Sequence, residues 1–109
     1  MQDPDDIELL RRYSKAKSDD AFALLVARYV NLVYSTALRQ VCNSYAAEEV
    51  TQAVFLILSK KAARLRNGVV LSSWLYQTTR FASANYLRTE IRRARREQEA
   101  YMQSLSNAP

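Results

Sequence analysis

The sequence predicts an all-α protein, a compact bundle of about four helices. Turn-forming residues are scarce among its 109 residues, since the only glycine is Gly68 and the only prolines are Pro4 and Pro109. A sheet with several hairpins needs more turn residues than this. Apolar residues instead recur every three or four positions over long stretches, which is the spacing of one helix face. A chain of this length forms one domain with one modest core.

The first two expected helices lie in the N-terminal part of the chain. Residues 5–15 form a short helix with Ile7, Leu10 and Tyr13 on one side, and three acids near its start suit the helix dipole. Residues 15–18 connect it to a long helix over about 19–41. Ser18 or Asp19 caps this helix by accepting a hydrogen bond from a free backbone N–H. Its apolar residues recur at helical spacing: Phe22, Leu25, Val26, Tyr29, Val33, Ala37 and Val41.

A third helix is expected over about 45–64, capped by Asn43 or Ser44. Its core stripe consists of Ala47, Val50, Val54, Ile57, Leu58 and Leu65. The opposite side is polar at its start and apolar at its centre, where Phe55 and Leu56 lie beside Gln52. Two interpretations of this second face remain open. It is a docking patch for another protein, or the first helix or the C-terminal tail covers Phe55 and Leu56.

A fourth helix follows the loop at residues 66–70 and runs from about residue 72 to at least residue 96. One face carries Leu71, Leu75, Thr78, Thr79, Ala82 and Tyr86, flanked by Trp74 and Phe81, and the other carries Ser73, Tyr76, Gln77, Arg80 and Arg88. Aromatic rings stack on unpaired bases, and arginines hold phosphates. This combination favours single-stranded nucleic acid, although Trp74 and Tyr76, taken individually, are more typical of a core. Residues 97–109 are expected to be a fraying tail.

Charge is distributed unevenly along the chain, whose net charge is +5. Residues 1–20 contain six acids and four bases, whereas residues 60–96 contain ten bases and one acid. A strongly cationic end is the expected footprint of a protein that binds a polyanion. The alternative is a solvated basic face with no partner.

Residues for catalysis or metal binding are few. The chain has no histidine, which removes Ser-His and Cys-His catalysis and the commonest transition-metal sites, and its acids do not cluster as a metal cage requires. We therefore expect no enzyme, metal or cofactor. Cys42 is the single cysteine, which suits a reducing cytosol. No signal peptide and no apolar run long enough to cross a membrane is recognised, so the expected location is cytoplasmic, without membrane contact.

Four collinear segments resemble region 2 of the bacterial sigma-70-type transcription initiation factors, specifically the small extracytoplasmic-function (ECF) group. They are residues 6–13 (DIELLRRY) with 20–22 and 28–29, residues 47–55 (AEEVTQAVF), residues 73–76 (SWLY), and residues 85–88 (NYLR) with 92–93. The resemblance covers roughly residues 5–96. It implies that residues 1–96 are a region 2 domain. Residues 97–109 would be a tail or the start of a linker to an absent region 4 domain.

The resemblance assigns the third helix to core RNA polymerase, where it docks on the coiled-coil clamp helices of the β′ subunit. By position, this implies polymerase contacts for Glu49, Gln52, Phe55 and Ser59, and the helical wheel adds Leu56. The family often has an acid after the glutamine, whereas this chain has Ala53. One polar contact is therefore expected to be missing.

The resemblance also implies recognition and melting of the −10 promoter element, with the last helix holding the displaced non-template strand. The loop before this helix would capture a base flipped out of the duplex. Asn67 offers both a donor and an acceptor to a base edge, and Gly68 permits a positive φ and close backbone approach. The DNA-binding candidates are Arg66, Asn67, Gly68, Ser73, Trp74, Gln77, Arg80, Arg88, Arg92 and Arg93.

The sequence therefore predicts a sigma-factor promoter-recognition domain that binds core RNA polymerase and promoter DNA. An anti-sigma factor is a further implied partner, and the isolated domain is expected to be monomeric. The alternative from another class is a non-enzymatic helical interaction module whose basic end contacts an acidic protein. That alternative predicts no preference for DNA over an acidic peptide of equal charge.

Overall fold

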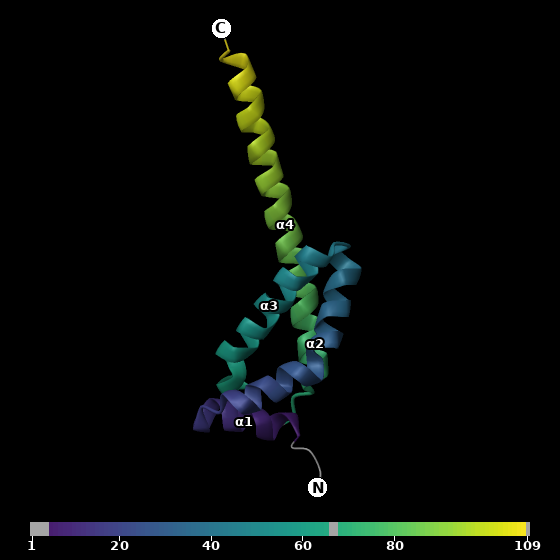
Figure 1. The fold of residues 1–109 in the computed structure, drawn as a ribbon, viewed down its shortest axis with the longest axis vertical. Coiled ribbons are helices and arrows are strands. Elements are labelled where there is room, and N and C mark those ends of the chain that lie inside the picture. Colours follow the sequence, from purple (N-terminus) through teal and green to yellow (C-terminus); the bar gives the residue numbers. More distant parts are fainter. Residues whose placement is uncertain (1–4, 66–67, 109) are drawn as a thin grey trace.

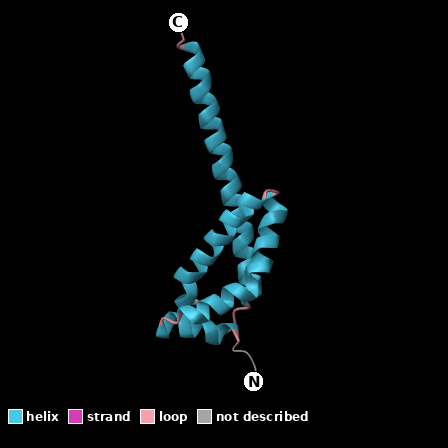
Figure 2. Cartoon of the chain, in the orientation of Figure 1, coloured by secondary structure: helices cyan, strands magenta, loops and turns pink. Residues whose placement is uncertain are grey.

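The computed structural model describes residues 5–65 and 68–108, and every regular element in these two ranges is a helix (Figures 1 and 2). The elements are α1 (Asp6–Ala16), α2 (Asp19–Val41), α3 (Ser44–Lys61), the short 3₁₀ helix η1 (Ala62–Arg64) and α4 (Leu71–Ser106). The first three helices and the first half of α4 form a bundle, and the second half of α4 projects from it (Figure 1). The predicted all-α fold with four helices is confirmed.

The first three helices begin within one residue of the positions that the sequence predicts, and a side chain caps each of them. Each cap accepts a hydrogen bond from a backbone N–H in the first turn, which otherwise has no partner. The caps are Asp5, Ser18 and Asn43, which accept from Glu8, Ala21 and Ala46 at 2.8, 3.2 and 2.9 Å. For α2 and α3, the observed cap is one of the two residues that the sequence offered.

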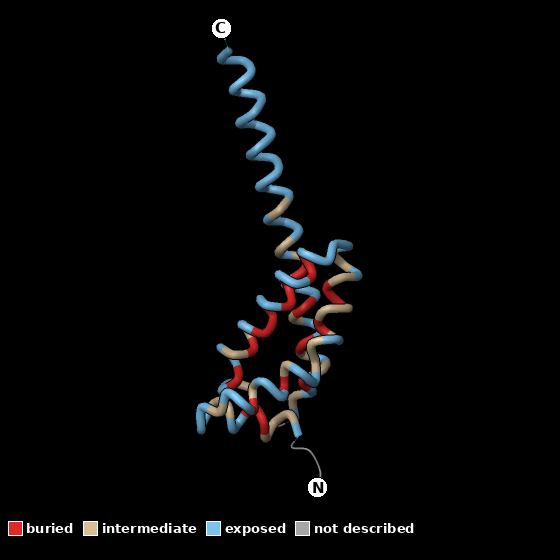
Figure 3. Tube along the Cα trace, viewed as in Figure 1, coloured by how far each residue is buried: buried red, intermediate tan, exposed pale blue. Residues whose placement is uncertain are grey.

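The core lies where α2, α3 and the first half of α4 face one another, with α1 closing one end (Figure 3). Its largest fully buried side chains are leucines from all four helices: Leu9, Leu10, Leu25, Leu58, Leu71 and Leu75. Within the core stripe predicted for the third helix, Ala47, Val50, Val54 and Leu58 are buried, whereas Ile57 and Leu65 are half-buried. The apolar periodicity therefore identified the buried face of α3.

Asp6 attaches α1 to α2. Its carboxylate accepts a hydrogen bond from the Arg28 guanidinium at 2.8 Å and another from the Tyr29 hydroxyl. The pKa of Tyr29 is raised to about 12, mainly by burial of the phenol and next by its hydrogen bond to Asp6, because both favour the protonated form. Tyr13 of α1 also packs beside Phe22 of α2, with ring centroids 4.7 Å apart. These contacts hold α1 against the first half of α2.

By length and composition alone, α2 is a candidate membrane span, which the sequence analysis did not recognise. An 18-residue window of this helix has a mean hydropathy of 1.4, and 28% of it is buried. Length and hydropathy alone are weak evidence for a membrane span, because the core helices of helical bundles have the same properties. Here α2 contacts α1, α3 and α4, and Leu25, Val33 and Ala37 are completely buried among them. The apolar composition of α2 is therefore used for packing against three helices.

The expectation of a fraying tail is wrong, because α4 continues to Ser106. The packed first half already nucleates the helix, so each further residue adds a hydrogen bond without a new nucleation cost. Residues 97–106 contain no glycine or proline, and most are good helix formers. All residues from 91 to 108 are exposed (Figure 3). The radius of gyration is 18.7 Å, against about 13 Å for a compact chain of this length.

Candidate functional site

An open apolar groove of about 480 Å³ lies between α2 and α3. We call it the α2–α3 groove. Its α2 side consists of Phe22, Val26 and Val30, and its α3 side consists of Thr51, Gln52, Phe55, Leu56 and Ser59. The two hydroxyl groups in this lining donate to carbonyls of their own helix, Thr51 to Ala47 at 2.7 Å and Ser59 to Leu56 at 2.6 Å. Their hydrogen-bonding needs are thus met locally, and most of the remaining lining is apolar.

Phe55 and Leu56 occupy different environments in this groove. Phe55 is only 8% exposed and belongs to the core, whereas Leu56 is 56% exposed. The sequence analysis had treated the two as one patch, either open or covered by the first helix or the tail. Phe55 lines the groove together with Phe22, Val26 and Val30 of α2, and the end of α4 points away from the bundle (Figure 1). Phe55 therefore forms the floor of the groove, and Leu56 offers apolar surface at its edge.

The groove brings together four of the five residues assigned to polymerase binding: Gln52, Phe55, Leu56 and Ser59. Glu49 is exposed but does not line the groove. The α2 side was missed, because Phe22 and Val26 had been placed in a single core stripe. In the structure the fully buried residues of α2 include Leu25 and Val33, while Phe22, Val26 and Val30 are only partly buried. The sequence did contain a signal for this second face, because the apolar residues of α2 extend around more of the helix than one buried stripe requires.

A second surface, the α4 face, lies on the first half of α4. Ser73, Tyr76 and Gln77 line an open groove of about 320 Å³ together with Ser72 and with Leu32 of α2. Tyr76 is 41% exposed, and the Arg80 guanidinium lies over its ring, with 5.8 Å between the guanidinium carbon and the ring centroid. An exposed ring, an amide and a cation are thus presented together. These groups suit stacking on a base and contact with a phosphate.

Trp74 and Tyr76 differ in burial, although the sequence analysis considered both of them typical of core residues. Trp74 is half-buried and packs against the core, as that interpretation predicts. Tyr76 points outward, as nucleic-acid binding would require. Only part of the Trp74 ring is therefore free for a ligand.

The arginines that follow do not all share the α4 face. Arg88 and Arg92 are exposed and lie within about 60° of Gln77 around the helix axis, by the helical repeat. Arg93 lies on nearly the opposite side, and it pairs with Glu90 at 2.6 Å and with Glu97 at 3.9 Å. These carboxylates, Glu90 first, raise the pKa of Arg93 and neutralise part of its charge locally. Arg93 is therefore the least suitable of the three for contacting a phosphate held on the α4 face.

The loop candidates are described only in part. Arg66 and Asn67 lie outside the described residues. Gly68 is exposed and has a φ of +94°, in the region that favours glycine. The expected positive φ is thus present immediately before the α4 face.

Within residues 5–65 and 68–108, no group of three or more histidine, cysteine or acidic side chains is placed to hold a metal ion. The two surfaces differ in chemistry: the α2–α3 groove is mostly apolar, and the α4 face combines an aromatic ring, an amide and a cation.

Comparison with protein families matches residues 25–97 to the family described as sigma-70 region 2. The matched range contains all of α3 and the α4 face, and it includes most of α2. Searches of curated proteins and of solved structures gave no significant match.

Proposed function

Because the chain belongs to the sigma-70 region 2 family, we propose that it directs core RNA polymerase to promoters through the α2–α3 groove and the α4 face. The family is one of transcription initiation factors and not of enzymes. In this proposal the groove binds the polymerase, and the α4 face binds the DNA strand that melting exposes.

The partner of the groove is the pair of β′ clamp helices. The observation that carries this assignment is that four residues chosen from α3 alone line one apolar groove together with α2. A helix docks in such a groove by burying its apolar ridge. Phe55 is already packed as the floor, so docking requires no rearrangement there, and Leu56 supplies exposed apolar area. Ala53 offers no polar group, so apolar contact dominates the binding.

The ligand of the α4 face is the non-template strand of the −10 element. In this proposal Tyr76, which is exposed beside the Arg80 guanidinium, stacks on an unpaired base, and the exposed Arg80, Arg88 and Arg92 contact the backbone. The half-buried Trp74 presents part of its ring toward the edge of the melted region. In this proposal the positive φ of Gly68 allows the backbone to approach a flipped base closely, and Arg66 and Asn67, which precede it in the sequence, remain candidates for contacting that base.

We further assign the protein to the ECF group, on the four segments that resemble it, and to the cytoplasm, where transcription takes place. An anti-sigma protein would inhibit this domain by covering the α2–α3 groove, the α4 face, or both. Covering the groove would abolish polymerase binding, covering the α4 face would abolish DNA binding, and covering both would abolish both.

Two double variants test the proposal in one assay. The chain is mixed with bacterial core RNA polymerase and a randomised pool of labelled single-stranded DNA, and both captured components are measured. Gln52→Ala/Leu56→Ala alters the groove and spares the core residue Phe55, whereas Tyr76→Ala/Arg80→Ala alters the α4 face. The groove variant should lose polymerase binding and keep DNA binding, whereas the α4-face variant should lose DNA binding and keep polymerase binding. Equal loss of both components in both variants contradicts the division. Displacement of the DNA by an acidic peptide of equal charge would favour a generic interaction module instead.

A further inference from the structure

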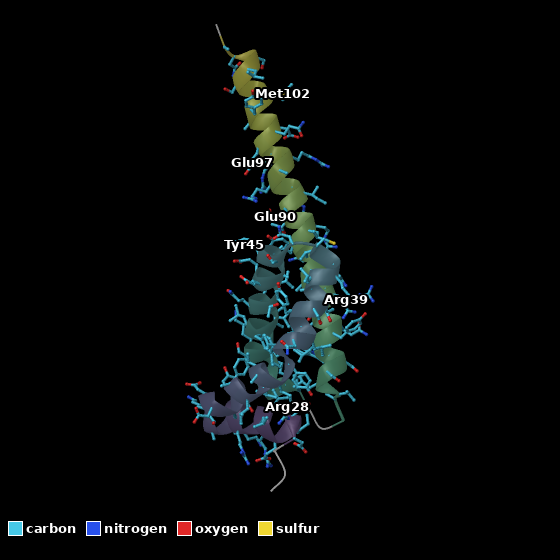
Figure 4. All side chains as sticks on the ribbon, turned by 45° about the vertical axis from the view of Figure 1, so that its right-hand side comes forward. Arg28, Arg39, Tyr45, Glu90, Glu97 and Met102 are labelled. Atoms are coloured by element: carbon cyan, nitrogen blue, oxygen red, sulfur yellow. The ribbon has the colours of Figure 1, made fainter. Side chains whose placement is uncertain are left out.

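The second half of α4 carries large apolar side chains that nothing in the described chain covers. Ile91, Tyr101, Met102 and Leu105 are each more than half exposed, at 59%, 64%, 58% and 54%. In Figure 4 the labelled side chains of Glu97 and Met102 extend from a helix that has no neighbour at that level. Scattered surface leucines need no explanation, but a row along one isolated helix indicates an interaction surface.

Ile91, Tyr101 and Leu105 follow the spacing of a coiled coil, and Met102 lies beside that stripe. Six positions are separated alternately by four and three residues, which we call the α4 seam: Leu87, Ile91, Ala94, Gln98, Tyr101 and Leu105. This 3.5-residue repeat keeps one stripe facing a partner helix along its whole length. By the helical repeat, the stripe lies about 100° around the axis from the face that α4 buries in the bundle. The bundle therefore leaves the seam open.

The charges beside the seam are sorted by sign. Arg88 and Arg95 flank it on one side, and Glu90 and Glu97 flank it on the other. In a parallel pair of helices, Glu90 of each chain faces Arg95 of the other, so attraction occurs twice. In an antiparallel pair, glutamates would face glutamates and arginines would face arginines. We therefore propose that the α4 seam binds the same seam of a second copy of this chain as a parallel, two-stranded coiled coil.

Little in the single chain opposes this pairing. Glu90 is bonded to Arg93 at 2.6 Å, but this is an exposed pair within one helix, and such pairs are weak. Gln98 is the one amide within the seam, a position where a polar residue fixes the register. The seam spans 19 residues, or about 28 Å of helix. This length is short for a coiled coil, so the dimer should be concentration-dependent, with the monomer expected from the sequence prevailing at low concentration.

Sedimentation equilibrium of the full chain, from micromolar to millimolar concentration, tests the pairing. Wild-type protein should approach the dimer mass with rising concentration. Ile91→Asp should remain monomeric, while Thr89→Asp, which adds the same charge to the same turn outside the seam, should dimerise as wild type does. Circular dichroism of each variant verifies that the helices persist.

Charge reversal tests the parallel orientation. Glu90→Arg and Arg95→Glu should each weaken association roughly tenfold, because two attractive pairs become repulsive. An equimolar mixture of the two variants should associate at least as well as wild type, because every pair is then opposite in charge. A chain that stays monomeric throughout overturns the proposal. It is also overturned if Ile91→Asp dimerises normally, or if Glu90→Arg strengthens association, as an antiparallel pair requires.

Discussion

Leu56→Ala should weaken the binding of core RNA polymerase about tenfold while leaving the fold intact. Leucine loses three carbons in this change, each worth about 0.8 kcal/mol when fully buried. Leu56 is 56% exposed, so docking can remove from water only this remaining part of its surface, which is about half of the side chain. The expected loss is therefore about 1.3 kcal/mol of binding free energy.

Leu24→Ala is the matched control, because it deletes the same atoms from a leucine that is 51% exposed. By the helical repeat, Leu24 lies on the side of α2 turned away from Phe22, Val26 and Val30. Fluorescence titration of labelled chain with core polymerase gives both dissociation constants, and thermal unfolding verifies that the two variants are equally stable. Equal weakening by Leu56→Ala and Leu24→Ala, or no weakening by Leu56→Ala, would refute the placement of the polymerase in the groove.

Three further predictions concern single side chains. Tyr76→Ala should cost about 1–3 kcal/mol in single-stranded DNA binding by fluorescence anisotropy, with an unchanged salt dependence because no charge is lost. An equal loss in Tyr76→Phe would argue against stacking. Ser83→Ala should be neutral or raise stability by about 1 kcal/mol in thermal unfolding, because the buried Ser83 hydroxyl has no hydrogen-bond partner among residues 5–65 and 68–108; a clear loss of stability would reveal a missed role. The pKa of Tyr29 is about 12 in the folded chain, against about 10 when unfolded. The unfolded chain therefore releases this proton first, and stability falls as the pH rises through this window. Urea unfolding of Tyr29→Phe should show a shallower alkaline loss than wild type, and parallel curves would contradict the assignment.

The helices were predictable because their determinants are local. Ser18 and Asn43 cap α2 and α3 through contacts within one turn, and such contacts are visible as sequence patterns. The end of α4 was not predicted, because its second half depends on nucleation by a packed first half. A pattern of residues read locally does not carry that information.

The candidate site was predictable on α3 but not on α2. Gln52 was proposed from its position in the resembling family segment, and Leu56 from the helical wheel, which places it on the side of α3 opposite the core stripe. The separation of Phe55 from Leu56 depends on how α2 crosses α3, since adjacent residues on a helix point about 100° apart. Which partly buried side chains of α2 complete the groove is likewise a property of packing. Periodicity ranks the apolar positions but does not say which of them remain half open.

The most direct test of the account is binding of the chain to a fragment containing the bacterial β′ clamp helices. The account predicts saturable, equimolar binding that Gln52→Ala/Leu56→Ala weakens and Tyr76→Ala/Arg80→Ala does not change. Absence of saturable binding by a chain shown to be folded would contradict it. So would a groove variant that binds the fragment as tightly as wild type.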